Sequence, residues 1–417
     1  MTGRFRQLRT GLLAILAAVL FGGADWRQFR GTDSSAVAPG QELPVRWGET
    51  ENVAWKIELP GRGPSSPIVV GGHVVVTASS GVHQDLLHVI CFDARSGRKQ
   101  WHRRFWATGQ TLCHPVSAVA APTPASDGRR IFAFYSSNDL VCLDLAGNLL
   151  WYRGLARDYP QARNDAGMAS SPLVMGETVI VQVENQGNSF AAGIDAASGV
   201  NRWRLQRPRV ASWSSPVAFY DSQPRRESVL LQSPLGLTAL DPQTGRKIWQ
   251  YEATCEEIPS LAVGGDVLYL AAAGVTALRP PATAEPGSCE VLWSENRLGP
   301  SAASPVVRGN RIYAVNPAGV LTCGDTETGQ ILWRLRLKGR FWATPLVVRN
   351  RLYLFNSDGL AQVVEETGAK GKGKLIGSSD FGEIIQGTPA VADGALFVRS
   401  DRHLWKIART GSDRPAK

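Results

Sequence analysis

The sequence predicts an all-β fold, an eight-bladed β-propeller of four-stranded antiparallel blades whose ring is closed by an N-terminal strand in the last blade. Three observations predict this fold. Hairpin segments that end in tryptophan recur along the chain, small residues followed by proline precede most of them, and no amphipathic helix of convincing length interrupts the series. Internal repeats of about 40 to 50 residues are typical of propeller blades. The 417 residues are therefore interpreted as one repeat domain.

The hairpin tryptophans occupy the same place in each repeat. Successive tryptophans are 46, 50, 52, 46, 44 and 40 residues apart. They are Trp55, Trp101, Trp151, Trp203, Trp249, Trp293 and Trp333. A packed indole ring buries about 150 Å² or more, and we expect these rings to lie between neighbouring blades.

Aspartates stand just before the turns of five of these hairpins. They are Asp93, Asp144, Asp195, Asp241 and Asp325. A short carboxylate at this place accepts hydrogen bonds from the backbone amides of the turn. We therefore interpret them as turn residues and not as paired catalytic acids.

Small residues followed by proline mark the start of each innermost strand. Inner strands crowd around the central channel, and proline is tolerated at the first residue of a strand. Seven such sites occur, at residues 65–67, 121–124, 170–172, 214–216, 303–305, 343–345 and 387–389. A degenerate eighth site, at residues 258–260, completes the count of eight blades.

The last blade lacks one strand of its own. From residue 384 onward the chain supplies three strands and then ends without a tryptophan hairpin. Residues 53–60, VAWKIELP, have the pattern of an outer strand and no partner nearby in the sequence. We expect them to close the ring, which removes exposed sheet edges. The propeller is then predicted to span residues 25–409, followed by a disordered tail at 410–417.

The amino terminus has the layout of a secretory signal peptide. Arg4, Arg6 and Arg9 precede an apolar run at residues 12–21, which is followed by small residues up to Ala24. The run is shorter than the roughly 20 residues that span a bilayer. We predict a signal peptide at residues 1–24, cleavage after Ala24, and a monomeric protein exported to the periplasm or cell envelope. The residue directly after this site is Asp25 and not a cysteine, so a lipid anchor is not expected.

Composition and motifs argue against several functions. The net charge of +9 is scattered, which does not favour nucleic-acid binding. The six cysteines form no C-x-x-C or adjacent pair, which removes the usual zinc and dithiol signatures. Cys91, Cys142 and Cys323 recur two residues before an aspartate and are expected to be small buried residues. An exported setting permits a disulfide, but the sequence assigns none. No G-x-S-x-G, H-E-x-x-H or P-loop motif is present.

The hairpins at residues 241–249 and 325–333 combine an aspartate, a Thr-Gly turn and a tryptophan. This pattern resembles the repeat of pyrroloquinoline-quinone (PQQ)-dependent alcohol dehydrogenases and of the outer-membrane assembly protein BamB. Residues 25–31, DWRQFRG, resemble the mature start of PQQ-like propellers of planctomycete-type bacteria. The resemblance covers nearly the whole predicted mature chain and implies the propeller fold.

The dehydrogenase resemblance implies a vicinal disulfide over the cofactor, a tryptophan floor, calcium carboxylates and a catalytic aspartate. This chain has no adjacent cysteines and no long inserts to roof a cofactor. The BamB resemblance implies a scaffold that engages partners through its loops. The missing lipid-attachment cysteine departs from that pattern.

A ligand site is expected on the face formed by the loops between blades and between second and third strands. The longest connections, residues 105–121 and 156–169, favour this face because long loops often carry function. Polar oxygens there could hold calcium, and aromatic rings with arginine could stack on a planar or sugar-like ligand. The candidate ligand-binding residues are His114, Asn138, Asp139, Asp158, Tyr159, Arg163, Asn164, Asp165, Glu184, Asn185, Trp213, Arg340, Trp342 and Asn356.

Three functions follow from these patterns. The leading hypothesis is an exported, non-catalytic scaffold that binds an envelope protein or a small polar ligand, with no catalytic residue and no certain cofactor. The alternative is a PQQ- or quinone-dependent alcohol or sugar dehydrogenase that uses PQQ with Ca²⁺, and Asp165, Glu184 and Asn185 form a possible calcium site. A third hypothesis is a sensor of a sugar or peptide at the channel mouth. Cys113 and His114 are not predicted to form a nucleophile pair, because adjacent side chains in an extended loop point apart.

Overall fold

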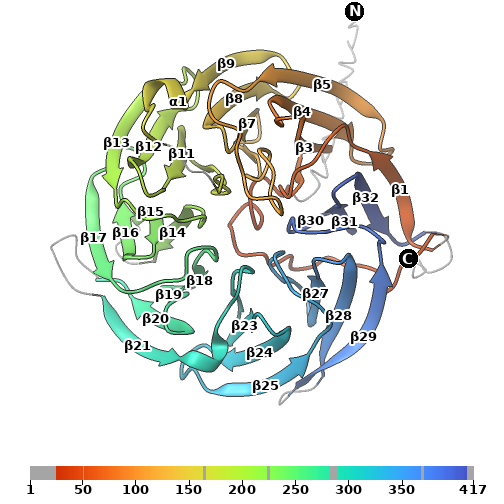
Figure 1. The fold of residues 1–417 in the computed structure, drawn as a ribbon. Helices are drawn as coiled ribbons and strands as arrows, with labels where there is room; N and C mark the ends of the chain where they lie inside the picture. Colours follow the sequence, from red (N-terminus) through yellow and green to blue (C-terminus); the bar gives the residue numbers. More distant parts are fainter. Residues whose placement is uncertain are drawn as a thin grey trace, which may run out of the picture.

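The computed structural model describes residues 25–49, 51–162, 166–222, 226–281, 289–367 and 371–410. They form eight four-stranded antiparallel sheets around a central axis, with the first strand of each blade innermost (Figure 1). The predicted eight-bladed propeller is confirmed. Two short helical turns are present in the described part, α1 (Leu155–Asp158) and η1 (Asn296–Leu298). No helix in the described ranges is long and apolar enough to cross a membrane.

The first four blades follow the chain in order. Blade 1 is β2 (Ile68–Val70), β3 (His73–Ser80), β4 (Leu86–Asp93) and β5 (Lys99–Trp106), and blade 2 is β6 (Ala125–Ser126), β7 (Arg130–Phe134), β8 (Asp139–Asp144) and β9 (Leu149–Gly154). Blade 3 is β10 (Leu173–Met175), β11 (Thr178–Val183), β12 (Ser189–Asp195) and β13 (Asn201–Arg207), and blade 4 is β14 (Val217–Asp221), β15 (Arg226–Ser233), β16 (Gly236–Leu240) and β17 (Lys247–Glu252).

The remaining blades repeat this order, except for the last. Blade 5 is β18 (Ala262–Gly264), β19 (Val267–Leu270), β20 (Val275–Arg279) and β21 (Glu290–Glu295), and blade 6 is β22 (Val306–Arg308), β23 (Arg311–Val315), β24 (Val320–Asp325) and β25 (Ile331–Arg336). Blade 7 is β26 (Leu346–Val348), β27 (Arg351–Phe355), β28 (Leu360–Thr367) and β29 (Lys372–Asp380). Blade 8 is β30 (Ala390–Ala392), β31 (Ala395–Arg399), β32 (His403–Ala408) and β1 (Val53–Glu58).

The amino-terminal strand β1 closes the ring as the sequence predicted. It pairs antiparallel with β32, with Ile57 opposite Leu404. Its half-buried residues alternate with exposed ones, which is the pattern of an outer strand with one packed face. Trp55 packs against Phe397 with ring centroids 5.8 Å apart. The first and last strands of the described chain are thereby paired in one sheet.

The hairpin tryptophans connect neighbouring blades. The indole N–H of Trp101 donates to the carbonyl of Leu145 in blade 2 at 2.9 Å, and that of Trp203 donates to the carbonyl of Pro242 in blade 4 at 2.9 Å. Gly147, in the turn of blade 2, lies so close that a Cβ there would be 2.6 Å from the Trp101 ring. The predicted position of these rings between blades is confirmed.

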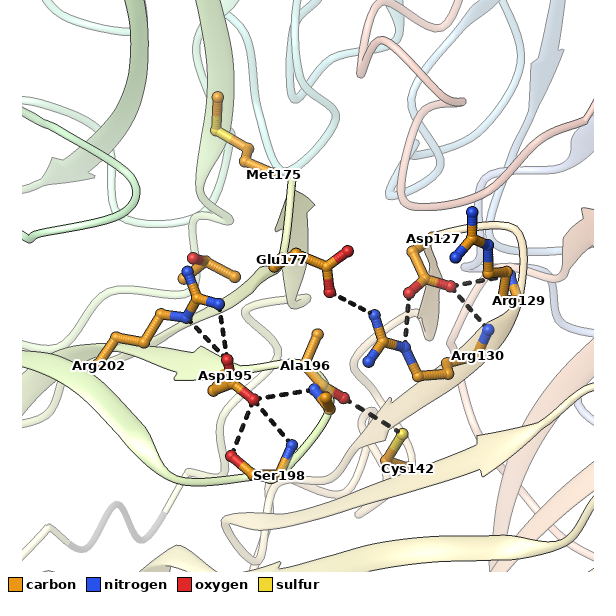
Figure 2. Close-up of polar contacts among 12 residues, drawn as sticks. Asp127, Arg129, Arg130, Cys142, Met175, Glu177, Asp195, Ala196, Ser198 and Arg202 are labelled. Carbon is orange, nitrogen blue, oxygen red and sulfur yellow. Dashed lines mark hydrogen bonds and ion pairs between the residues drawn. The ribbon is translucent and has the colours of Figure 1, made fainter.

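The turn aspartates bind the backbone of their own hairpins, as Figure 2 shows for Asp195. Asp195 accepts hydrogen bonds from the backbone N–H and the hydroxyl of Ser198, both at 2.8 Å, and pairs with Arg202 at 2.6 Å. These hydrogen bonds hold the pKa of Asp195 well below its ordinary value. Figure 2 also shows Arg130 reaching from blade 2 to Glu177 of blade 3, at 2.8 Å. The interpretation of the aspartates as turn residues is confirmed.

The six cysteines are free thiols and five of them are buried. Cys91, Cys142 and Cys323 are fully buried in equivalent strands, as expected for small core residues. Burial raises the pKa of each of these three thiols to about 12. They are therefore protonated and unreactive at neutral pH.

His88 and His102 form a histidine pair in blade 1, in which His88 is buried. His88 lies 2.8 Å from His102 (Nδ1 to Nε2) and 2.7 Å from the hydroxyl of Ser80. Burial, then the neighbouring His102 and Arg104, lower the pKa of His88 to about 4. The unfolded chain takes up this proton near the ordinary value of 6.5, so stability is present above pH 6.5 and lost as pH falls toward 4.

We expect His88 to contribute a loss of up to about 3 kcal/mol in unfolding free energy between pH 7 and pH 4. Urea unfolding of the predicted mature chain across this range measures the loss. His88→Gln removes the titrating ring and is expected to flatten this part of the profile. An unchanged slope in that variant would assign the acid sensitivity to other groups.

Residues 25–49 cross one face of the ring, the face that carries the turn between the first and second strands of each blade. The sequence did not predict this feature. Trp26 exchanges two backbone hydrogen bonds with Val69 of blade 1, at 2.8 and 2.9 Å. The buried guanidinium of Arg30 donates to the carbonyl of Leu261, next to blade 5, at 2.9 Å. The N–H of Ala38 donates to Val347 of blade 7 at 2.9 Å. In Figure 1 this segment runs through the middle of the ring, and we call it the floor segment.

Candidate functional site

The central channel ends as a cavity of about 350 Å³ that all eight blades line. Phe29 of the floor segment is among its lining residues. The loops between blades contribute the opposite end, where His114, Val116, Trp213 and Trp342 line the cavity. We call the face formed by these loops the loop face. The cavity is therefore a socket that opens on the loop face and has the floor segment behind it.

A hydroxyl residue from each blade lines the wall of the socket. These residues form the hydroxyl ring, Ser66, Thr123, Ser171, Ser215, Ser260, Ser304, Thr344 and Thr388. The backbone N–H of one member donates to the side-chain oxygen of the next, as from Ser66 to Thr123 at 3.0 Å and from Thr123 to Ser171 at 3.0 Å. Six blade junctions carry this bond. The small residues before the prolines thus join the blades as well as fitting the narrow channel.

Three of the predicted residues meet at the socket. His114 is exposed, and its backbone N–H donates to the carbonyl of Ala166 at 3.0 Å. Trp213 is half-buried, and its indole N–H donates to Gly167 at 2.7 Å. Trp342 keeps 39% of its surface exposed. The mouth of the socket is therefore aromatic and apolar, with two indole rings from different blades.

Asn138 lines a second cavity, of about 410 Å³, that we call the side cavity. It lies between the loops that follow blades 1 and 2 and includes Thr108, Ser136, Pro160 and Ala162. The neighbouring Asp139 is fully buried and does not line it. Its carboxylate accepts hydrogen bonds from the N–H and hydroxyl of Thr108, from the hydroxyl of Ser137 and from Tyr152. Asp139 therefore fixes the position of Thr108, which lines the side cavity.

Asp158 and Tyr159 are bound locally. Arg153 forms an ion pair with Asp158. The Tyr159 ring lies 4.3 Å from Phe190, and its hydroxyl accepts a hydrogen bond from Asn201 at 2.6 Å. Neither residue is among those that line the two cavities. The Tyr159 side chain joins the loop after blade 2 to blade 3, whereas Asp158 binds back to β9 of blade 2.

Glu184 and Asn185 are buried in blade 3. Arg207 pairs with Glu184 at 2.5 Å, and both side chains are almost completely enclosed. Burial raises the pKa of the Glu184 carboxyl, while Arg207 acts in the opposite direction. Asn185 accepts a hydrogen bond from the N–H of Gly187 at 2.7 Å and binds within its own turn.

The remaining candidates lie elsewhere. Asn356 is buried; it accepts a hydrogen bond from the N–H of Leu360 in its own turn at 2.8 Å and donates to the carbonyl of Lys338, in the loop after β25, at 3.0 Å. Arg340 is exposed, and its carbonyl accepts from the N–H of Ser357 at 2.8 Å. Three predicted residues, including one of the possible calcium set, lie outside the described residues: Arg163, Asn164 and Asp165. The calcium site therefore stays a prediction.

Sequence reasoning missed the floor and the wall of the socket. Phe29 belongs to a segment without repeat periodicity, so no pattern placed it on the axis. The hydroxyl ring did leave a signal, because a Ser or Thr stands before the proline in seven of the eight inner-strand sites. That signal was interpreted only as a requirement for small side chains.

PQQ and calcium do not fit the described residues of the socket. PQQ carries three carboxylates that need cationic or multiple N–H partners, and calcium needs carboxylate or carbonyl oxygens. Among the described lining residues none is Arg, Lys, Asp or Glu. Across the described ranges, no group of three or more His, Cys, Asp or Glu side chains could hold a metal ion.

The repeat, the ring and the socket define this chain as a PQQ-like eight-bladed β-propeller. A family model described as outer membrane protein assembly factor BamB matches residues 27–164, 160–261 and 271–372, and the chain belongs to this family. No curated protein matches the sequence significantly.

Solved structures resemble this chain in fold. BamB from Moraxella catarrhalis has a TM-score of 0.62 at 17% identity and covers 87% of this chain and 99% of its own. A quinohemoprotein alcohol dehydrogenase from Comamonas testosteroni has a TM-score of 0.67 at 13% identity, with 94% and 82% covered. A europium-containing methanol dehydrogenase has a TM-score of 0.65 at 13% identity, with 92% and 89% covered. At these identities the likeness shows the fold alone.

Proposed function

We propose that this chain is an exported, non-catalytic binding scaffold of the cell envelope that holds a partner protein on its loop face. The observation that carries the proposal is the socket, with Phe29 at one end and exposed apolar residues at the other. Such an arrangement suits an inserted apolar or aromatic side chain of a partner, with the loops around it as a rim. The mature chain acts as a monomer.

The surface around the socket supports this choice of face. Trp342 and Val116 are 39% and 46% exposed at the mouth, and Trp106, at the end of β5, is 68% exposed. Exposed aromatic and apolar side chains around a cavity mark interaction sites more often than isolated ones do. The described lining of the socket also contains no Arg, Lys, Asp or Glu, which favours an uncharged inserted group. Membership of a family described as an assembly factor agrees with a scaffold.

A paired substitution tests the proposal. Trp342→Glu places a carboxylate at the mouth, where burying it against a partner is costly. The control Leu332→Glu changes an exposed residue of the outer strand β25, which is 43% exposed. Affinity capture from envelope fractions, followed by titration of the purified captured protein, is expected to show binding at least about tenfold weaker for Trp342→Glu only.

Equal binding by both variants would contradict the proposed face. Incubation of the same protein with PQQ and Ca²⁺ tests the dehydrogenase alternative. A bound chromophore together with alcohol-dependent reduction of an artificial electron acceptor would replace the scaffold by an enzyme. Amino-terminal sequencing of the exported protein is expected to begin at Asp25, which tests the predicted cleavage site.

A further inference from the structure

We propose that the side cavity binds an uncharged, polyhydroxylated ligand of the size of one monosaccharide unit, separately from any partner in the socket. The cavity has about 410 Å³, which is room for a single sugar ring. Its described lining combines hydroxyl and amide groups with small apolar residues and contains no Arg, Lys, Asp or Glu. The lining residues are Thr108, Gly109, Gln110, Ser136, Asn138, Ala156, Pro160 and Ala162.

Asn138 stands where other blades of this chain have glycine. The carbonyl of Asn138 accepts the N–H of the residue after the outer strand, and Gly319 of blade 6 and Gly359 of blade 7 make the same bond, at 2.8 to 3.0 Å. All three residues have a positive φ, +62° for Asn138, +75° for Gly319 and +95° for Gly359. Glycine adopts this conformation without steric cost. The turn therefore does not require the carboxamide of Asn138.

That carboxamide is held rigidly and is only partly satisfied. Its Nδ2 donates to the carbonyl of Ala162 at 3.0 Å, which fixes the orientation of the group. Its Oδ1 is buried and has no hydrogen-bond partner in the described part of the chain. A buried acceptor without a partner costs free energy. A ligand O–H or N–H that enters the cavity would satisfy it.

Two other lining residues, Thr108 and Ser136, are also held in place. Thr108 donates its hydroxyl to Asp139 at 2.5 Å, and Asp139 also accepts the N–H of Thr108 at 3.0 Å. Gly154 permits this approach, because a Cβ there would lie 2.4 Å from the Thr108 hydroxyl oxygen. The hydroxyl of Ser136 accepts the N–H of Met168 at 2.7 Å, which leaves its O–H to donate.

These groups select the class of ligand. The unpaired amide oxygen of Asn138 can accept a hydrogen bond from a ligand, and the hydroxyl groups can donate or accept one. The described lining has no Arg, Lys, Asp or Glu that could pair with a charged ligand. A charged ligand would lose its hydration without compensation. Neutral sugar hydroxyls match this set, and the apolar faces of Ala156, Pro160 and Ala162 suit the C–H face of a sugar ring.

The test uses the mature chain and the variant Asn138→Gly, which restores the turn residue of blades 6 and 7. D-glucose, D-galactose and N-acetyl-D-glucosamine are titrated at millimolar concentrations, and chemical shifts of the Asn138 and Thr108 signals are followed by NMR. At least one sugar is expected to saturate these shifts, with affinity about tenfold lower in Asn138→Gly, which is the loss of about one hydrogen bond. The melting temperature of the variant should not fall.

The matched control is Ala273→Gly, which relieves another non-glycine residue of positive φ, +49°, in the corresponding turn region of blade 5. It should bind sugar like the unmodified chain. The proposal is overturned if none of the three sugars saturates these signals, or if Asn138→Gly binds them equally well. Trp342→Glu leaves the side cavity intact, so sugar binding by that variant separates this proposal from the proposed scaffold function.

Discussion

A chain that begins at residue 61 is expected to lose at least about 5 kcal/mol of unfolding free energy relative to the chain that begins at residue 25. It lacks both the floor segment and β1, and without β1 the outer edge of β32 becomes unpaired. The inward residues of β1, such as Trp55 and Ile57, lose their packing against blade 8, which is worth about 1.5 to 3 kcal/mol for each large apolar side chain. The lost ladder hydrogen bonds add about 1 kcal/mol each. Calorimetry should show a melting temperature lower by roughly 10 °C.

A third chain, beginning at Asn52, separates the contribution of β1 to stability from that of the floor segment. It keeps β1 and lacks the floor segment, and we expect it to retain ring closure and to melt between the other two. A synthetic peptide of residues 51–60 added to the shortest chain should raise its melting temperature in proportion to occupancy. If the chain beginning at residue 61 melted like the one beginning at residue 52, β1 would not be the closing strand.

Replacing Arg207 by Met is expected to destabilise the protein by about 3 to 5 kcal/mol, because it leaves the Glu184 carboxylate buried without its partner. Arg207 also donates to the hydroxyl of Thr238, at 3.0 Å, and so connects blades 3 and 4. The double variant Glu184→Leu/Arg207→Met removes both charges and should be less destabilised than Arg207→Met. Chemical denaturation of the three proteins measures the difference.

The destabilisation caused by Arg207→Met should also depend on pH. Burial raises the pKa of the folded Glu184 carboxyl, and removing Arg207 removes an opposing influence. The folded state of Arg207→Met then holds a proton that the unfolded state has released, so the loss of stability relative to the unmodified chain should become smaller as pH falls from 8 to 5. A loss that is equal at both pH values, or a double variant as unstable as Arg207→Met, would show that the carboxylate is not the cause.

The ring was predictable because its signals are periodic. Tryptophans and turn aspartates recur in each hairpin, and the surplus strand at residues 53–60 had only one possible partner sheet. The floor segment was not predictable. Several of its contacts with distant blades are made by backbone groups, such as those of Ala38 and Val347, and backbone hydrogen bonds leave no mark in the side-chain pattern.

The candidate site was predictable only in its location. Loop length indicated the loop face, and His114, Trp213, Trp342 and Asn138 do line cavities there. Asn356 and Asn185 are polar because they bind their own turns, and sequence alone does not separate such a residue from a ligand-binding one. A comparison of turns between blades would have distinguished Asn138, since it replaces a glycine.

The proposed use of one face of the ring is tested most directly by photo-crosslinking in intact envelopes. A photoreactive phenylalanine analogue is placed at Trp342 on the loop face, or at Asp33 in the exposed part of the floor segment. We predict a discrete crosslinked partner from position 342 and none from position 33. The same product from both positions, or a product from position 33 alone, would contradict the assignment of the loop face as the binding surface.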